Sequence, residues 1–289
     1  RGTIGSSSYV MGDETAASMA AALEMYTKNG GNPRFNLLDF TRFPKARTAL
    51  YFPIRAHTAG LWTMRIGNVS GPDKGYAKAW KYVEECGTAW RWTKDPVFAY
   101  VLKNYGKRES WTGAEWDEIV KAGAILKRAP WMDQPSRVLA GYAAFLETGL
   151  PYDDIRFRRS VMLRVGVGYG HAHNDTLDMQ IQAHGLPMTV DAGQRPGYST
   201  PDDSAARVHN TVVVDGRGGG NSWIRTLSDL DGARYINAQV APGSLGNYAA
   251  RQVALLDVDE GAGSQSLGPE ALGPRPRNLP KGVTTPNSY

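Results

Sequence analysis

The segment that decides the fold spans residues 171–216 and has the sequence HAHNDTLDMQIQAHGLPMTVDAGQRPGYSTPDDSAARVHNTVVVDG. It contains four of the five histidines of the 289-residue chain. Polar and apolar residues alternate over 176–183, His184-Gly185 is a turn signal, and 187–191 is a second short stretch, so this part predicts a β-hairpin. The β-branched residues 210–214 (NTVVV) predict a third strand after an interruption rich in Gly and Pro.

Three side chains at the ends of these predicted strands form a candidate metal site. Side chains two residues apart on a strand point to the same face, so we expect His171 and His173 to project together. Asp191 ends the second predicted strand and His209 precedes the third, which would bring His173, Asp191 and His209 to one point. Two imidazoles and a carboxylate suit Zn²⁺, with a fourth position for water, and His171 stays available for a substrate. The alternative is that these histidines are ordinary hydrogen-bonded turn residues.

The same residues resemble a known family. The pattern HxHxD at 171–175, xDxG at 190–193, a tyrosine at 198 and HNTVxVDG at 209–216 is similar to that of the heparinase II/III-like polysaccharide lyases. Residues 251–260 (RQVALLDVDE) also resemble a strand of that family. The resemblance implies a multidomain α and β protein, in which an N-terminal α/α toroid, present here in part, is followed by an antiparallel β-sandwich.

The predicted helices and strands divide the chain into the same two domains. We expect residues 1–135 to form the helical domain, with helices at 15–27, 76–86, 96–104 and 113–126, the last opened by Thr112 as N-cap. Seven tryptophans lie in this half, and we expect most of them to be core residues. The domain of antiparallel strands is expected over 136–289, with strands at 138–146, 155–165, 233–240 and 251–258 and an irregular tail at 261–289.

The amino-acid composition limits the classes of protein to which this chain can belong. With 42% hydrophobic and 21% charged residues the chain is an ordinary globular protein, and no apolar run is long enough to span a membrane. The net charge of +5 suits an anionic ligand, whereas no Lys/Arg-rich run points to nucleic acid. A lone Cys86 excludes an internal disulfide. The chain opens on Arg1 without a signal-peptide pattern, so we expect processing or truncation of a secreted or periplasmic protein, possible as a homo-oligomer.

The resemblance also implies roles for individual residues. Tyr9 lies in a Gly- and Ser-rich stretch before the first predicted helix and is the candidate catalytic base and acid, with Tyr26 and Tyr51 as weaker substitutes. His171 is the second catalytic candidate, and a structural Zn²⁺ would position its loop. The candidate substrate-binding residues are Arg195, Tyr198 and Arg207. Each of these residues also has an ordinary structural reading, as a helix-entry aromatic or a solvated surface side chain.

The expected reaction is β-elimination on a uronic-acid-containing anionic polysaccharide, such as a glycosaminoglycan or alginate. This reaction needs a group that neutralises the substrate carboxylate, a base for the C5 proton and an acid for the leaving O4. The family residue that neutralises the carboxylate has no match in this chain, although His57 or Asn68 is a possible substitute; the other reading of His57 is a buried or surface structural residue. Two alternatives stay open: a glycoside hydrolase, which needs two opposed carboxylates, and a non-catalytic or truncated metal-containing glycan-binding protein.

Overall fold

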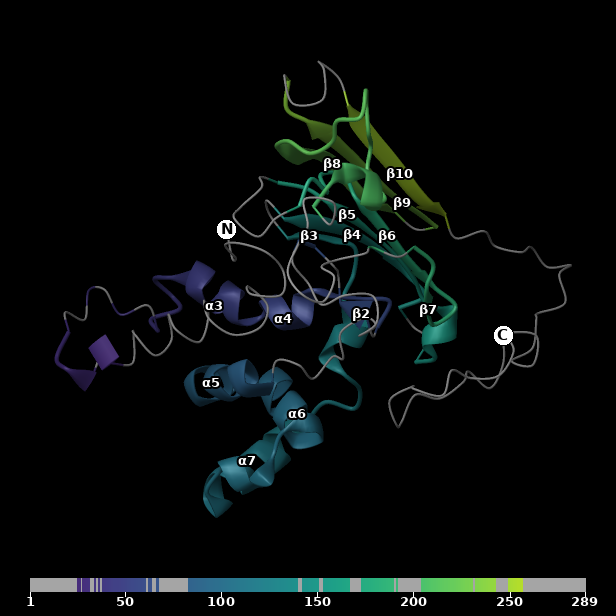
Figure 1. Ribbon diagram of the computed structural model, residues 1–289. Coiled ribbons are helices and arrows are strands. Elements are labelled where there is room, and N and C mark those ends of the chain that lie inside the picture. Colours follow the sequence, from purple (N-terminus) through teal and green to yellow (C-terminus); the bar gives the residue numbers. More distant parts are fainter. Residues whose placement is uncertain are drawn as a thin grey trace, which may run out of the picture.

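Helices occupy the first half of the described chain and strands the second half (Figure 1). The computed structural model describes residues 25–26, 28–31, 34, 36, 38–60, 62–63, 66–67, 83–139, 142–150, 153–166, 173–189, 191, 204–230, 232–242 and 249–256. The α-helices in these ranges are α3 (Pro44–Leu50), α4 (Phe52–Arg55), α5 (Val83–Thr93), α6 (Pro96–Tyr105) and α7 (Gly113–Gly123). None of the helices in the described ranges is long and apolar enough to cross a membrane.

Helices α6 and α7 form where the sequence predicted them, and local capping explains both. The Asp95 side chain accepts a hydrogen bond from the backbone N–H of Val97, and proline opens α6. Thr112 and Glu115 cap α7 reciprocally, so the predicted N-cap is confirmed. The two helices pack against α5 around a core that includes Phe98, Leu102, Ile119, Trp90 and Trp131. Trp62, Trp92, Trp111 and Trp116 pack partly buried against this core, which confirms their predicted role.

The strands form two antiparallel sheets and one short pair. The five-stranded sheet has the order β3-β4-β5-β6-β7, and the three-stranded sheet has the order β10-β9-β8. Their bounds are β3 Arg137–Leu139, β4 Ala143–Thr148, β5 Arg159–Arg164, β6 Met179–Ala183, β7 Leu186–Pro187, β8 Ser222–Leu230, β9 Ala233–Val240 and β10 Ala250–Leu256. The short pair, β1 (His57–Thr58) with β2 (Trp62–Thr63), lies inside the helical half and was not predicted.

Four strand predictions were wrong in detail. Residues 155–157 form the 3₁₀ turn η6 (Ile155–Phe157) ahead of β5, so 155–165 is a strand only in part. Of the strand predicted at 187–191, only Pro187 lies in a strand among the described residues, as the end of β7. Residues 138–146 form two strands rather than one, because the chain turns between β3 and β4 with the N–H of Tyr142 donating to the carbonyl of Leu139.

Residues 210–214 are not a strand, although Val214 makes a single bridge to Arg217. The N–H of Asn210 donates to a carboxylate of Asp178 instead of to a neighbouring strand. A hydrogen bond to a polar side chain thus takes the place of the backbone hydrogen bonds between strands that the β-branched neighbours of residue 210 favour.

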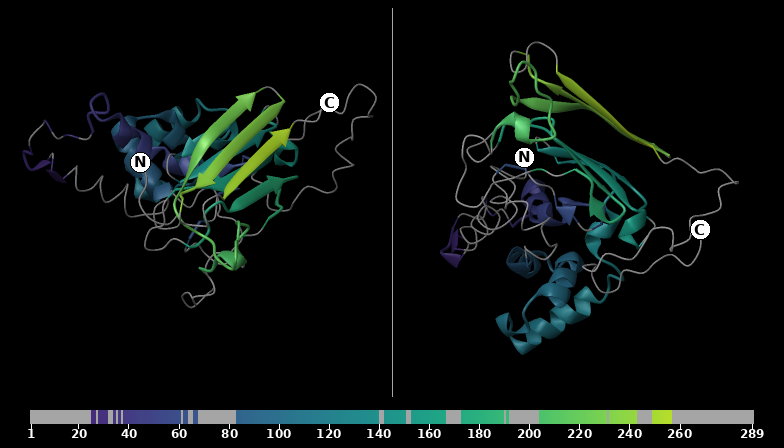
Figure 2. Two further views of the ribbon diagram at one scale, coloured as in Figure 1. Left: turned by 90° about the horizontal axis from the view of Figure 1, so that it is seen from above. Right: turned by 45° about the vertical axis from the view of Figure 1, so that its right-hand side comes forward.

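The five-stranded sheet is buried on both faces (Figure 2). On one face, Leu146 and Leu163 pack against Ile236 and Val240 of the three-stranded sheet. On the other face, the alternate residues of the same strands, among them Phe145, pack against Ala56 and Ile66 of the helical half. The molecule therefore has three layers in the described ranges: helices, the five-stranded sheet and the three-stranded sheet.

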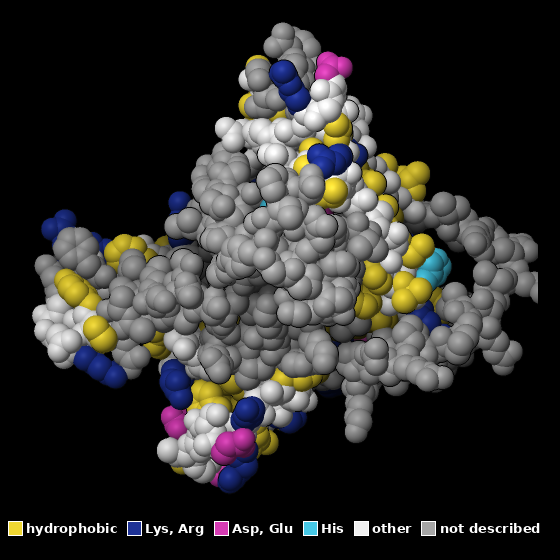
Figure 3. All heavy atoms as spheres, viewed as in Figure 1, with side chains coloured by type: hydrophobic (Ala, Val, Ile, Leu, Met, Phe, Trp, Pro, Cys, Tyr) yellow, Lys and Arg dark blue, Asp and Glu magenta, His cyan; other side chains and the backbone are white. Residues whose placement is uncertain are grey.

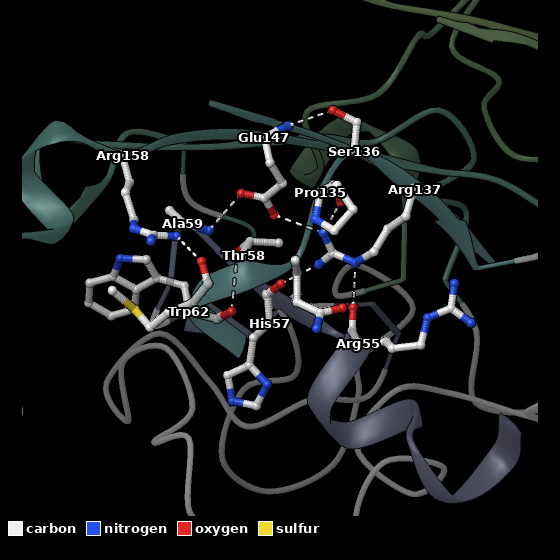
Figure 4. Close-up of polar contacts among 12 residues, drawn as sticks. Arg55, His57, Thr58, Ala59, Trp62, Pro135, Ser136, Arg137, Glu147 and Arg158 are labelled. Carbon is white, nitrogen blue, oxygen red and sulfur yellow. Dashed lines mark hydrogen bonds and ion pairs between the residues drawn. The ribbon is translucent and has the colours of Figure 1, made fainter. Parts of the chain in front are cut away.

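A buried ion pair between β3 and β4 also forms hydrogen bonds with the backbone of the helical half (Figure 4). Arg137 Nη1 lies 3.1 Å from Glu147 Oε1, and both side chains are buried. Arg137 also donates to the carbonyls of Arg55 and His57, while the second oxygen of Glu147 accepts the N–H of Ala59 at 3.0 Å. Burial lowers the pKa of Arg137 and raises that of Glu147, so each group depends on the other to stay charged.

We predict that Glu147→Gln lowers the free energy of unfolding by about 3 kcal/mol or more, because it leaves the guanidinium of Arg137 buried without a countercharge. The matched control is Glu118→Gln on the surface of the helical half, where acidic and basic side chains lie together (Figure 3). It removes the carboxylate of the exposed pair with Lys94 and should change stability by less than about 1 kcal/mol. Urea unfolding followed by circular dichroism measures both variants. Equal effects of the two substitutions would show that the buried pair does not hold the layers together.

Candidate functional site: a buried histidine and aspartate cluster

The predicted metal-site residues come from three separate segments that meet beside the five-stranded sheet. His173 lies in the loop before β6, Asp191 follows the β6–β7 hairpin, and His209 follows the 3₁₀ turn η7 (Ala206–Val208). The predicted turn at His184-Gly185 is confirmed, and both of its residues have positive φ, 55° and 73°. This tight turn sends the chain back along β6 and thereby returns Asp191 to the histidines.

The three side chains lie close together and are buried. His209 Nδ1 lies 2.7 Å from Asp191 Oδ2, with 0% and 1% of the two side chains exposed. The ring centroids of His173 and His209 are 5.1 Å apart, and the rings are tilted by 45°. The structure therefore brings together the three residues that the sequence singled out as ligands.

Further carboxylates surround His209. Burial lowers the pKa of its imidazole, but the hydrogen bond and the negative charge of Asp191, with contributions from Asp175 and Asp178, outweigh burial and raise it. Burial and the nearby Asp191 raise the pKa of Asp178 to about 7, against the opposing hydrogen bond from Gln180. The cluster thus places three buried carboxylates, Asp175, Asp178 and Asp191, beside one buried guanidinium, that of Arg164, and it favours a cation at His209, either an imidazolium or a metal ion.

The donor set suits a zinc ion, but its present geometry is that of a hydrogen bond. His209 Nε2 is buried and has no hydrogen-bond partner among the described residues, as expected of a nitrogen left for another ligand. Because Nδ1 already contacts Asp191, a metal ion bound at Nε2 would leave Asp191 as a hydrogen-bond partner that orients His209, whereas direct binding by both side chains would need Nδ1 as the ligand and a longer contact with Asp191. Within the described ranges, no three His, Cys, Asp or Glu side chains form a ready metal-binding group.

Side-chain hydrogen bonds fix the loops that carry the cluster. Asp178 Oδ1 accepts the N–H of Asn210 at 2.8 Å, next to His209. Arg251 on β10 donates through one nitrogen to the carbonyls of Leu177 and Asn210, at 2.7 and 2.6 Å. These contacts tie the loop after His173 to the loop after His209. The sequence indicated no positioning role for Asp178 or Arg251. Its only signal was that each is a charged residue within a predicted strand.

Asp175, the last residue of the HxHxD pattern, connects the cluster to the helical half. Its Oδ2 accepts the N–H of Gly67 at 3.3 Å, and its Oδ1 lies 3.6 Å from Arg164 Nε. Both Asp175 and Asp178 are only 1% exposed. Neither carboxylate is placed to reach a substrate from solvent, so they do not form the opposed pair that a glycoside hydrolase needs.

The other candidates fall into two groups. Five of them lie outside the described residues: Tyr9, His171, Arg195, Tyr198 and Asn68. Arg207 is exposed and lies two residues before His209, on the surface next to the cluster.

Two possible substitutes occupy structural positions. His57 is 1% exposed and stacks on Trp131 with 4.9 Å between ring centroids, which confirms the structural reading of this residue. Tyr51 donates its hydroxyl to Asp95 in the helical core, and burial followed by this hydrogen bond raises its pKa. A tyrosine that acts as a base needs the opposite shift.

Comparison with known proteins gives a likeness in structure but none in sequence. No family model matches the chain, and no curated protein matches it. A solved structure described as a heparinase III gene product aligns with a TM-score of 0.57 at 14% identity, covering 84% of this chain and 34% of its own. The heparan sulfate lyase HepC from Pedobacter heparinus aligns with a TM-score of 0.42 at 15% identity, covering 77% of this chain and 42% of its own. The chain thus spans about a third of the length of the first of these structures, and its described part has a heparinase-like fold.

Proposed function

We propose that this chain is part of a polysaccharide lyase that cleaves a uronic-acid-containing anionic glycan by β-elimination. The observation that carries the proposal is the meeting of His173, Asp191 and His209, from three separate segments, within a heparinase-like fold. The solved structure that aligns with a TM-score of 0.57 is described as a heparinase III, which supports the same reaction class. The helices would then be part of an α/α toroid, the two sheets would form its β-sandwich, and the protein would act outside the cytoplasm.

The catalytic roles follow from the chemistry of the elimination. The C5 proton of a uronate becomes acidic when the neighbouring carboxylate is neutralised, and a base must then remove it while an acid protonates the leaving O4. We assign the base and acid to Tyr9 with assistance from His171, two residues before the buried His173. The exposed Arg207 next to the cluster suits a carboxylate or sulfate of the substrate, together with Arg195 and Tyr198.

A zinc ion held by His173, Asp191 and His209 would have a structural role. The ion would supply a fixed point that holds the His171 loop against the neighbouring loops. The buried carboxylates around His209 support a cation there; Asp191 would bind it together with Nδ1 of His209, or would orient the imidazole if the open Nε2 is the ligand. The hydrogen bonds of Asp178 and Arg251 already hold the same loops from the other side, so these two residues would orient the ligands rather than touch the substrate.

The lyase proposal predicts a rising ultraviolet absorbance from unsaturated uronate when the protein is incubated with heparan sulfate, chondroitin sulfate or alginate. Tyr9→Phe and His171→Ala should each lower the rate by about a hundredfold or more, because each removes a proton-transfer group. Tyr51→Phe is the matched control and should keep the rate, since its hydroxyl serves a helix contact. Binding of these glycans without any new double bond would instead support the non-catalytic glycan-binding protein.

The metal proposal predicts that the purified protein contains close to one zinc per chain by elemental analysis. His173→Ala and His209→Ala should abolish this zinc, and a chelator should lower the melting temperature of the wild type but not of these variants. His184→Asn is the control, because this exposed histidine lies in a turn with positive φ, which asparagine tolerates. Zinc content that persists in both alanine variants would rule out the site.

A further inference from the structure

The outer face of the three-stranded sheet is uncovered in the described structure (Figure 2, left). The inward residues of these strands, such as Ile236 and Val240, pack on the five-stranded sheet. Their neighbours point the other way because side chains alternate along a strand. Strand pairing places Trp223, Gln239 and Ala250 in one row across this face. The next row contains Thr226, Asn237 and Gln252, and the row after it contains Ser228 and Tyr235.

Trp223 gives this face an aromatic platform. It is 42% exposed and is the one tryptophan of the described residues that lies among the exposed large hydrophobic side chains. Tyr235, partly buried on the same face, is four residues from Gln239, the cross-strand partner of Trp223. The two rings therefore lie roughly 13 Å apart along the strands, a separation that a short oligosaccharide bridges. Flat aromatic surfaces with a polar edge suit the alternating C–H and O–H faces of sugar rings.

The polar groups of the face indicate an anionic ligand. Arg225 occupies the bulge in β8, is exposed, and donates to Gln239 Oε1 at 2.6 Å, beside Trp223. It forms no ion pair with any residue in the described ranges, whereas Arg234 on the same sheet pairs with Asp229 at 3.1 Å. A guanidinium without a countercharge is well suited to a carboxylate or sulfate.

We propose that the face defined by Trp223, Arg225, Tyr235, Asn237, Gln239 and Gln252 is a second binding site for an acidic glycan chain. The site is separate from the histidine cluster, because Arg251, the neighbour of Gln252, points inward and binds the carbonyls of the cluster loops. Its exposed leucines, Leu230 and Leu256, lie at one end, while amides and hydroxyls fill the centre, unlike the apolar centre of a protein interface. The acidic character of the ligand rests on the proposed function, and the site would retain a polymeric substrate between cleavages.

The test is affinity electrophoresis of the whole chain in native gels that contain heparin, with dextran as the neutral polymer. Trp223→Ala and Arg225→Gln should each weaken the heparin-dependent retardation by about tenfold, in line with loss of an interface anchor. Arg234→Gln is the matched control, since it removes the same charge from an arginine that is already paired, and its retardation by heparin, measured against its own mobility in a heparin-free gel, should equal that of the wild type. The rate on a heparin tetrasaccharide should be unchanged in all three variants, whereas the rate on the polymer should fall in the first two.

Several outcomes would overturn the second site. Heparin retardation that is equal in the wild type and in Trp223→Ala would do so, as would a wild type that heparin does not retard. A dimer in sedimentation that Trp223→Ala converts to a monomer would make the face a contact between copies of this chain. Retardation that depends on Trp223 without any unsaturated uronate would keep the second site and reject the lyase, so the two proposals fail separately.

Discussion

Burial of strand β4 on both of its faces is the constraint on which the other layers depend. All six of its residues are buried, with Leu146 facing the three-stranded sheet and Phe145 facing the helical half. A strand in this position cannot expose its charged residue, so Glu147 is buried with it and must find a countercharge. Arg137 on the neighbouring strand supplies the charge and also binds carbonyls from the helical half. The contact with Glu147 therefore pairs two buried charges within the sheet, and the other donors of Arg137 bind backbone carbonyls of the helical half.

The histidine cluster shows a second use of buried charge. Its loops lack the continuous ladder of a sheet, and side chains such as Asp178 and Arg251 hold their backbone instead. Burial first, and then the negative charge of the nearby Asp191, raise the pKa of Asp178. Arg164, 3.6 Å from Asp175, already supplies one positive charge, and a further cation at His209 would offset the remaining carboxylates. The proposed zinc ion and a protonated His209 are two ways to provide it, and zinc content distinguishes them.

Local signals explain which elements the sequence could predict. The cap at Thr112 located α7, and the alternation over residues 233–240 located β9 with both of its bounds. The segment 210–214 was predicted wrongly because β-branched residues favour strands, whereas the contacts of Asn210 with Asp178 and Arg251 decide its conformation. Those partners are 32 and 41 residues away in the chain, so no local pattern reveals them.

The same distinction applies to the candidate site. Clustering of histidines in one stretch led to the prediction that His173, Asp191 and His209 meet, although the strand ends on which that prediction was argued are absent: β7 ends at Pro187 and residues 210–214 are not a strand. Residues that position the cluster through a single polar side chain have no comparable signal. Trp223 is a similar case, since its exposure depends on which face of β8 is covered by the other sheet. Register decides this property, and a shift by one residue would exchange the tryptophan with the buried face.

Strand β10 links the two candidate sites through that register. Arg251 points inward and fixes the loops of the histidine cluster, while its neighbour Gln252 lies on the face that carries Trp223. Side chains that alternate along one strand can therefore serve a buried positioning role and an exposed binding role without sharing any contact. A glycan bound to the outer face would contact β10, the strand whose Arg251 holds the cluster loops, but it would do so on the opposite side of the sheet. The geometry thus favours independent contributions of the outer face and of the histidine cluster over coupling between them.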